Sequence, residues 1–478
     1  MRTIFILLLF CFSSNSFSQE GIFPKFLSDS SMIHASVSLC VADAESEELI
    51  MEYDSEKSLT PASVLKLITS AAALELLGPQ YTFKTIIGYT GSLNKRTGKL
   101  VGDIVIKGGG DPTLGSKYFP DHYQDFPDNW AKAIKNLGIK KIIGRVITDD
   151  SYYDYQPVPA KWLWEDTGNY YGAGVYGLSV FDNTYEIHLN TSADSSMVVI
   201  TDILPIEYRY EFSNWLNAAG TSDEGYVFAA PYSTNGWLAG TIPANMDDFI
   251  LEASIADPPK LLAEIMTAKI KKEGITILKE PSTLRLEQIK PAEKITVITE
   301  NISPPLVDII EVLNHESVNL YAEHLIKELG KIYNGEGSTS AGCEVIIDFL
   351  HKAGVKTDGM FLEDGSGLSP LNAINSKELV SLLIYMKSKG THFPEYYSSL
   401  PDAGEEGTVK NYFKAPVFDS RVRVKSGSMT RVRSYAGYIT TLSHKELAFS
   451  IIINNYSNSS KEIISGVEGI IEEIILYK

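Results

Sequence analysis

Residues 58–79 read SLTPASVLKLITSAAALELLGP, and this stretch predicts where the fold begins. Pro61 suits the first turn of a helix, the apolar run Val64–Leu77 predicts a buried helix, and the Gly-Pro pair that follows ends it. Ser63 therefore lies at a helix N-terminus, where free backbone N–H groups and the helix dipole favour developing negative charge. Lys66 is three residues further on, so its side chain lies on the same helix face within reach of Ser63.

Two further triplets follow in the chain. Ser317-Val-Asn319 falls within a helical pattern over Leu306–Leu329, and Lys425-Ser-Gly427 ends the alternating strand pattern Arg421–Lys425. Acyl transfer requires a nucleophile, a base, an oxyanion site and groups that hold the substrate. The order of a helix start, a later helix and a strand, each with its own triplet, predicts an active-site serine centre that uses lysine as the base.

The predicted roles follow from side-chain chemistry. Lysine acts as a base only when neutral, and both burial and a second cation lower its pKa. Lys425 is the expected second cation for Lys66, and Ser317 is placed to shuttle protons between these lysines and a leaving nitrogen. The Asn319 amide is expected to bind a peptide backbone.

Substrate contacts are also expected from the third triplet. Lys425 and Ser426 are predicted to hold a substrate carboxylate, and Gly427 continues the strand beside them. The backbone N–H groups of Ser63 and Ser428 are the expected oxyanion donors.

Single motifs of this kind also arise by chance. Ser92-Leu-Asn-Lys95 repeats the first motif and Ser233-Thr-Asn235 repeats the second. The first copy falls in a polar turn between strands, so we expect it to be exposed and not catalytic.

The rest of the pattern predicts an α+β fold. An antiparallel sheet flanked by helices is expected from strands at both ends of the chain, beginning with a hairpin over residues 34–53. A catalytic domain over 19–80 and 250–478 is expected to be interrupted by a β-rich insertion over 81–249. The expected elements are strands at 82–89, 99–107 (paired with 82–89), 141–148, 184–189, 197–203, 434–440 and 447–453, and helices at 260–272, 338–353, 376–389 and 463–476.

Composition limits the function classes. The chain has 478 residues and a net charge of −18, which disfavours binding to nucleic acid or to anionic membranes through a basic patch. Residues 1–18 resemble a secretory signal peptide, with Arg2 before a short apolar run; an uncleaved anchor is the alternative. No other stretch approaches a transmembrane span.

Metal and disulfide chemistry receive little support from the sequence. The eight histidines show no metal-ligand spacing, so we expect no metal site and no cofactor, and we expect His315 and His324 to be packing or surface residues. Cys40 and Cys343 are expected to be small buried side chains, and whether they pair is left open.

The motifs resemble those of the class C low-molecular-mass penicillin-binding proteins, which are bacterial D-alanyl-D-alanine carboxypeptidases and endopeptidases. The resemblance covers nearly the whole mature chain, including the separation of 254 positions from Ser63 to Ser317. Further matching segments are Pro61–Ser63, Gly109–Leu114, Gly144–Asp150, Asp364–Ser369 and Glu406–Thr408.

The resemblance implies a periplasmic serine DD-peptidase with the penicillin-binding transpeptidase and β-lactamase-like fold. Its partners would be peptidoglycan stem peptides and β-lactam antibiotics, with no nucleic acid and at most peripheral membrane contact. Ser63 would form the acyl-enzyme, and Asp149 in the insertion would reach the stem peptide. Pro370 stands where some members carry arginine, and Ser426 where threonine is common.

Two other functions use the same residues. A non-catalytic module that binds peptidoglycan or β-lactams would keep the fold without turnover. A β-lactamase or esterase would use the same centre, but the long insertion and the lack of an assignable deacylating glutamate favour the DD-peptidase.

Overall fold

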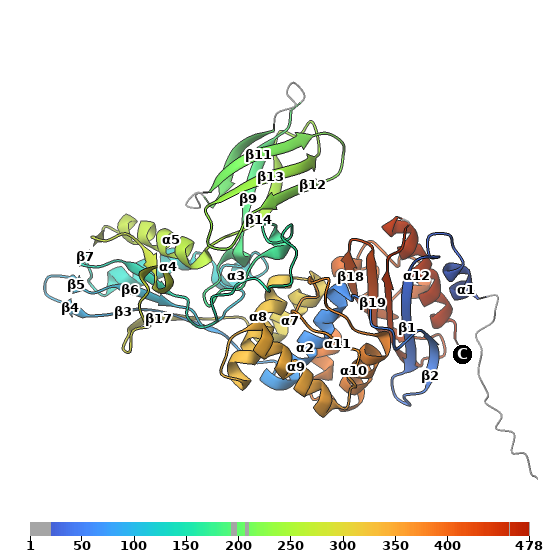
Figure 1. The fold of residues 1–478 in the computed structure, drawn as a ribbon. Helices are drawn as coiled ribbons and strands as arrows, with labels where there is room; N and C mark the ends of the chain where they lie inside the picture. Colours follow the sequence, from blue (N-terminus) through green and yellow to red (C-terminus); the bar gives the residue numbers. More distant parts are fainter. Residues whose placement is uncertain (1–20, 193–197, 206–209, 458, 478) are drawn as a thin grey trace, which may run out of the picture.

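The computed structural model describes residues 21–192, 198–205, 210–457 and 459–477 (Figure 1). The predicted signal peptide, residues 1–18, lies outside the described residues. The other elements group into a catalytic domain and a long insertion, which we describe in turn.

The catalytic sheet joins the two ends of the chain, which confirms the predicted α+β architecture. Its strand order is β18-β19-β20-β1-β2, and β1 pairs antiparallel with β20 along its whole length. Helix α12 and the short α1 cover one face of the sheet, and the helical half of the domain covers the other (Figure 1). The strands are β1 (Ser36–Asp43), β2 (Leu49–Tyr53), β18 (Val422–Met429), β19 (Val432–Thr440) and β20 (Glu446–Asn454).

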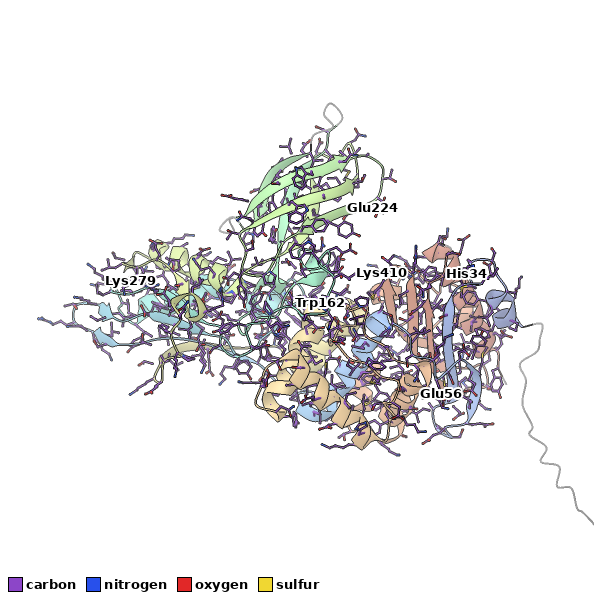
Figure 2. The ribbon with its side chains drawn as sticks, in the orientation of Figure 1. His34, Glu56, Trp162, Glu224, Lys279 and Lys410 are labelled. Carbon is purple, nitrogen blue, oxygen red and sulfur yellow. The ribbon has the colours of Figure 1, made fainter. Side chains whose placement is uncertain are left out.

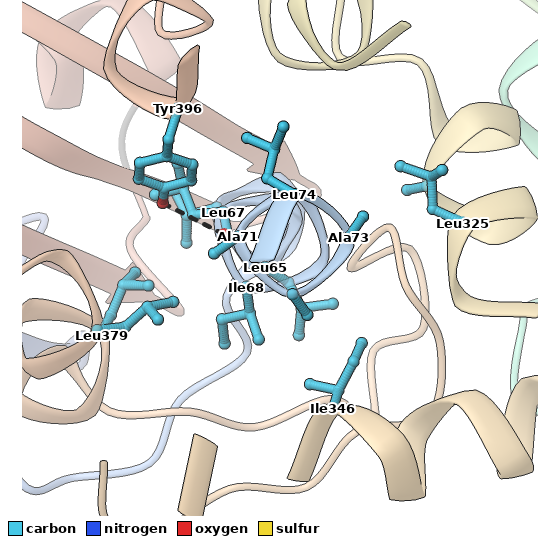
Figure 3. Close-up of a cluster of buried hydrophobic side chains, with 14 of the residues drawn as sticks. Leu65, Leu67, Ile68, Ala71, Ala73, Leu74, Leu325, Ile346, Leu379 and Tyr396 are labelled. Carbon is cyan, nitrogen blue, oxygen red and sulfur yellow. Dashed lines mark hydrogen bonds between the residues drawn. The ribbon is translucent and has the colours of Figure 1, made fainter. Parts of the chain in front are cut away.

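Helix α2 (Lys66–Leu77) runs through the centre of the catalytic domain and is preceded by the 3-10 turn η1 (Ala62–Leu65). Its residues Leu67, Ala71 and Leu74 are fully buried among side chains of the surrounding helices (Figure 3). The helices of this domain are α1 (Ile22–Leu27), α7 (Leu306–His315), α8 (Asn319–Tyr333), α9 (Thr339–Ala353), α10 (Ser376–Lys389), α11 (Phe393–Ser398) and α12 (Ser460–Ile475), with the turns η4 (Gly407–Val409) and η5 (Pro416–Phe418).

The single helix predicted over Leu306–Leu329 is wrong, because the chain breaks between α7 and α8. Ser317 lies in the break with φ 58°, a left-handed conformation that no α-helix continues through. Apolar periodicity persists across the break, which explains why the sequence pattern did not reveal it.

The insertion is longer than predicted, so the expected return to the catalytic domain at residue 250 is wrong. β14 (Phe249–Ser254) pairs with β9 (Thr184–Asn190), and β17 (Thr296–Ile302) pairs with β3 (Lys84–Tyr89), so the insertion continues through Ile302. Helix α5 (Pro258–Lys272), which was expected in the catalytic domain, packs on β8 (Val146–Asp149) and α4 (Phe126–Asn136) of the insertion. Periodicity identifies these elements as strands and a helix but carries no information about which sheet they join.

In the first half of the insertion, the predicted pairing of residues 82–89 with 99–107 is found only in part. β3 pairs with β6, whereas β4 and β5 form a separate hairpin. The strand predicted over 141–148 splits at Gly144, where a Cβ would lie 2.1 Å from the Gly102 carbonyl oxygen. The elements are β3 (Lys84–Tyr89), β4 (Ser92–Asn94), β5 (Lys99–Val101), β6 (Ile104–Lys107), α3 (Pro120–Tyr123), α4 (Phe126–Asn136), β7 (Lys141–Ile142), β8 (Val146–Asp149), α5 (Pro258–Lys272), β15 (Thr276–Ile277), β16 (Ser282–Thr283), α6 (Leu284–Glu287) and β17 (Thr296–Ile302).

The second half of the insertion is a pair of small sheets packed face to face, which rises above the rest of the molecule in Figure 1. One sheet has the order β10-β9-β14 and the other β11-β13-β12. Leu216, Val227 and Leu238 fill the core between them. The elements are η2 (Tyr170–Gly172), η3 (Phe181–Asn183), β9 (Thr184–Asn190), β10 (Val199–Leu204), β11 (Glu211–Ala218), β12 (Glu224–Phe228), β13 (Asn235–Ile242) and β14 (Phe249–Ser254).

The two segments that connect the catalytic domain to the insertion lie side by side. Phe83 N donates to Ser303 Oγ at 2.9 Å, and Ser303 N donates back to the Phe83 carbonyl at 3.0 Å. Leu306 N also donates to the Tyr81 carbonyl at 2.9 Å. The insertion therefore leaves and re-enters the catalytic domain at one point.

Helix α8 carries most of the polar contacts at this junction. Glu328 accepts hydrogen bonds from the hydroxyls of Tyr81, Tyr152 and Tyr153. Lys327, whose side chain is 1% exposed, pairs with Asp154 at 2.6 Å. The same helix begins at Asn319, so one element connects the insertion with the predicted site.

Candidate active site

Ser63 lies in the 3-10 turn that leads into α2, as the prediction of a helix N-terminus requires. The preceding Ala62 has φ 50°, a left-handed conformation, and Ser63 itself is partly exposed. Lys66 Nζ lies 3.0 Å from Ser63 Oγ. This distance is short enough for proton transfer between the two side chains.

Lys66 is fully buried, and it contacts neutral groups. Its Nζ donates to Asn319 Oδ1 at 2.5 Å and to the Ser366 carbonyl at 2.8 Å. Among the residues that the structure describes, no carboxylate lies within ion-pair distance of it. Burial lowers the pKa of Lys66 to about 7, against the opposing influence of Asp364 and Glu323. A large fraction of Lys66 is therefore neutral near pH 7, as a general base must be.

Lys425 faces Ser317 across the site. Its Nζ donates to Ser317 Oγ at 2.9 Å and to the Ser426 carbonyl at 2.9 Å. Burial, followed by the charge of Lys66, holds the pKa of Lys425 well below its usual range. Ser317 has a left-handed backbone conformation at the α7–α8 break, and this conformation places its hydroxyl beside Lys425.

β18 is an edge strand of the catalytic sheet, and it passes directly beside Ser63. A Cβ at Gly427 would lie 2.8 Å from Ser63 N and 2.3 Å from Ser434 Oγ, so only glycine permits this approach. Ser428 follows on the strand and is exposed. The edge strand leaves backbone groups available to pair with an extended peptide.

Ser426 adds a hydroxyl at the mouth of the site. Its Oγ lies 2.8 Å from Thr408 Oγ1. Thr408 belongs to Glu406–Thr408, one of the segments that carry the family resemblance. Two hydroxyls beside the Lys425 backbone suit a carboxylate ligand.

Sequence reasoning missed Glu323, which lies beneath the site. Its Oε1 accepts hydrogen bonds from Gly365 N at 3.0 Å and Ser366 N at 2.7 Å, and the Ser366 carbonyl in turn accepts from Lys66. Burial, and then the neighbouring Asp364, raise the pKa of Glu323 to about 8. The available signal was its position four residues after Asn319, on the same helix face and directly after the apolar run Leu320–Ala322.

Asp364 fixes the loop that carries Ser366. Its carboxylate accepts from Gly367 N at 2.8 Å and Ser369 N at 2.6 Å, and also from the Trp162 indole N–H at 2.8 Å. Trp162 belongs to the insertion and lies where the insertion meets the catalytic domain (Figure 2). The insertion therefore supports the active-site loop directly.

A second insertion residue reaches the site itself. Asn319 Nδ2 donates to the Tyr171 carbonyl at 2.8 Å while its Oδ1 accepts from Lys66. Both ends of this amide are thus engaged, which fixes the orientation of the Asn319 side chain beside Lys66.

The structure brings Ser63, Lys66, Ser317, Asn319 and Lys425 together, but not Asp149. Asp149 is buried at the end of β8, where its Oδ1 accepts from Ser151 Oγ at 2.6 Å. The neighbouring Asp150 lies 3.8 Å from Arg285 within the insertion.

The remaining expectations concern residues outside the cluster. Ser92 and Lys95 are exposed on the β4–β5 hairpin, as predicted. His324 is a buried packing residue, bonded to the Gly110 carbonyl at 2.9 Å. Cys40 is buried, Cys343 is partly buried, and both are free thiols. In the described part of the chain, no helix is long and apolar enough to cross a membrane.

This fold and site geometry define a class of enzyme: a serine hydrolase in which lysines replace histidine in acyl transfer. The sequence profile of the D-Ala-D-Ala carboxypeptidase 3 (S13) family matches residues 23–473. The chain belongs to that family and is a serine-type D-Ala-D-Ala carboxypeptidase/endopeptidase of the penicillin-binding proteins, as the motifs predicted.

Two similar proteins named as D-alanyl-D-alanine carboxypeptidases agree with this family assignment. The chain is 28% identical to the D-alanyl-D-alanine carboxypeptidase of Actinomadura sp. (strain R39) over 90% of this chain and 80% of that protein. It is 23% identical to the D-alanyl-D-alanine carboxypeptidase DacB of Haemophilus influenzae over 90% and 87% of the two chains.

Solved structures share the fold. Penicillin-binding protein 4 of Haemophilus influenzae superposes with a TM-score of 0.80 at 22% identity, covering 93% of this chain and 97% of that one. The predatory peptidoglycan endopeptidase Bd3459 of Bdellovibrio bacteriovorus gives a TM-score of 0.51 at 17% identity, covering 92% of each chain.

Proposed function

We propose that this enzyme cleaves the terminal D-alanine from peptidoglycan stem peptides, and D-Ala cross-links between them, through an acyl-enzyme on Ser63. The observation that carries this proposal is the 3.0 Å contact between Ser63 Oγ and a fully buried Lys66 without an ion-paired carboxylate. Export to the periplasm is part of the proposal and is supported by the signal-like residues 1–18.

Acylation begins with a proton transfer. Neutral Lys66 accepts the Ser63 proton as Oγ attacks the carbonyl before the terminal D-alanine. The backbone N–H groups of Ser63 and Ser428 stabilise the resulting oxyanion. As the C–N bond breaks, the leaving amine receives a proton through Ser317, which lies 2.9 Å from Lys425 Nζ.

Substrate recognition uses the edge strand and its neighbours. The stem peptide pairs with β18, the Asn319 amide binds its backbone, and Ser426 with Lys425 holds the terminal carboxylate. Water then releases the acyl group from Ser63, and a β-lactam acylates the same oxygen. A contact between Asp149 and the stem peptide stays a prediction.

The test is intact-mass spectrometry of the mature protein with a penicillin, followed by peptide mapping over hours. A stable adduct on the Ser63 peptide, absent in Ser63→Ala, is the expected result. Rapid drug turnover would instead indicate a β-lactamase. A folded protein that forms no adduct would indicate a binding module without catalysis.

A further inference from the structure

A group of exposed and partly exposed aromatic side chains lies on the insertion, and none of them takes part in the mechanism. In the β11-β13-β12 sheet, Leu216, Val227 and Leu238 point into the core between the two sheets. Side chains alternate between the faces of a strand, so their neighbours lie on the opposite, outward face. That face carries Trp215, Tyr226, Phe228 and Trp237, and the loop residue Trp164 lies against it; we call these five residues the aromatic platform.

Cross-strand pairing makes the platform continuous. Phe228 and Trp237 are register partners whose rings stack at 5.2 Å with 10° between their planes. The ring centroids of Trp164 and Trp237 lie 6.1 Å apart, so the aromatic surface extends from the sheet onto the loop that carries Trp164. Trp215 and Tyr226 are both register partners of Ala239, a small residue that leaves the space between them open.

Two members of the platform are unusually exposed for side chains of this size, and the other three are partly exposed. Trp215 is 67% exposed and Trp164 is 51% exposed. Such contiguous exposed aromatic surface on a folded domain marks an interaction site. Nothing in the catalytic mechanism uses it.

The charge around the platform narrows the choice of ligand. Strands β11, β12 and β13 are all described, and they contain no lysine or arginine. The outward face carries instead the acids Glu211 and Glu224 and neutral polar groups such as Asn217 and Thr241. A phosphate polymer or an anionic membrane would find no cation on these three strands, whereas a neutral polyol would find both flat rings and hydrogen-bonding groups.

The platform is connected to the active site by one loop. Thr167 Oγ1 donates to the Ala229 carbonyl at 2.9 Å, and Val227 N donates to Asn169 Oδ1 at 3.0 Å, which fixes the loop along β12. The same loop ends at Tyr171, whose carbonyl accepts from Asn319 of the catalytic cluster. Figure 2 shows Glu224 of β12 on the side of the insertion that faces Lys410, above Trp162.

We propose that the aromatic platform binds the glycan strand of peptidoglycan, a neutral polysaccharide of N-acetylated hexoses. The negative faces of aromatic rings attract the partly positive C–H edges of a pyranose ring, which lies flat on them. This inference rests on the proposed function, because the stem peptide in the catalytic cleft is a branch of that same strand. The platform would hold the strand while a peptide branch enters the site.

The binding test uses chitin oligosaccharides, neutral chains of N-acetylated hexoses, as the glycan probe, because peptide-free strands of peptidoglycan would carry a free carboxylate on every second sugar. In a Ser63→Ala background the protein should bind these oligosaccharides, and Trp215→Ala or Trp237→Ala should weaken binding about tenfold or more, in line with the loss of an aromatic stacking contact. Trp215→Phe, which keeps a ring, should retain most of the binding. Tyr53→Ala on β2, an aromatic 40% exposed at the far edge of the catalytic sheet, is the matched control and should bind normally.

Activity assays separate this inference from the proposed function. In the active enzyme, Trp215→Ala should leave kcat/KM on a soluble, glycan-free D-Ala-D-Ala pentapeptide within about twofold, while hydrolysis of intact peptidoglycan falls several-fold. Failure of the parent enzyme to cleave the pentapeptide would refute the proposed function alone, since glycan binding is measured independently of turnover.

Three results would overturn the glycan assignment. One is undetectable binding of chitin oligosaccharides by folded Ser63→Ala protein. Another is unchanged binding in both tryptophan variants. The third is Trp215-dependent binding to neutral phospholipid vesicles, or Trp215-dependent self-association, in place of glycan binding.

Discussion

Two buried lysines, on the neighbouring helices α2 and α8, differ in their chemistry because their surroundings differ. Lys66 in the catalytic cluster and Lys327 at the insertion junction are each nearly inaccessible to solvent, and burial lowers the pKa of both. Lys327 has a carboxylate partner, Asp154, at 2.6 Å, whereas Lys66 contacts a hydroxyl, an amide and a carbonyl.

The difference shows how the fold separates a structural cation from a base. The acids near Lys66 are occupied elsewhere: Glu323 and Asp364 accept from backbone N–H groups of the 364–369 loop. Since these acids are held away from ion-pair distance, Lys66 loses its proton readily. At the junction, direct pairing favours the ammonium form of Lys327.

The largest expected effect comes from removing the base. Lys66→Met should reduce the rate of penicillin acylation by about 10²–10⁴-fold, the range typical of a general base. Stopped-flow or quenched mass spectrometry measures the rate. Lys95→Met, in the second copy of the same motif, is the control and should acylate normally; equal losses in both variants would contradict the assignment.

The two lysines should also differ in their contribution to stability. Lys66 has a folded pKa of about 7 against a usual 10.5, so between these values the unfolded chain binds more protons and stability rises with pH. Lys66→Met removes that cost and should raise Tm at pH 7, with the gain shrinking as pH approaches 10.

Lys327→Met should change Tm in the opposite direction and lower it. It leaves Asp154 without its partner, and because that carboxylate is one third exposed the cost is about 1–3 kcal/mol, a Tm lower by a few degrees. Differential scanning calorimetry of both variants across pH 7–10 tests the pair. A lower Tm for Lys66→Met at pH 7 would show that its hydrogen bonds outweigh its desolvation.

The pH dependence of acylation should sharpen the contrast further. The rate should rise with pH through about 7 as Lys66 loses its proton, and level off above about 8, where nearly all of Lys66 is neutral. Glu323→Gln removes a charge that raises the Lys66 pKa, so it should move the acid limb of the profile to lower pH and leave the plateau rate near that of the parent. Glu328→Gln at the junction should leave the profile unchanged, and an unmoved acid limb in Glu323→Gln would argue against this coupling.

The smallest effect is expected from the junction tyrosines. Tyr153→Phe removes the hydroxyl that donates to Glu328 Oε2 at 2.7 Å, while Tyr81 and Tyr152 continue to donate to Oε1. The cost should be about 1 kcal/mol of stability, with acylation within twofold of the parent. A large loss of activity would mean that the junction controls catalysis more tightly than its geometry indicates.

The sequence predicted the reacting side chains of the site but not the residue that positions the loop beneath them. Ser63, Lys66, Ser317, Asn319 and Lys425 were identifiable because acyl transfer demands those side chains in short motifs. The support of Lys66 by Glu323 depends on a tertiary contact between α8 and the Gly365–Ser366 backbone, which no local pattern encodes.

The fold shows the same division. The strands of the catalytic sheet and most helices were identifiable from periodicity, because a buried face imposes its period on the sequence. The α7–α8 break at Ser317 and the return of the chain near Ile302 were not, since they depend on a single backbone angle and on strand partners far away in sequence.

The pairing of β1 with β20 has a consequence for the order of assembly. Ser36 is the register partner of Asn454, so one of the first strands to be synthesised completes its sheet with one of the last. The insertion lies between them and contains its own sheets, so it can gain structure while β1 still lacks its neighbour. Lys425 arrives on the same late strands, and a growing chain therefore holds Ser63 and Lys66 without the second lysine. Catalytic competence begins only when the sheet closes.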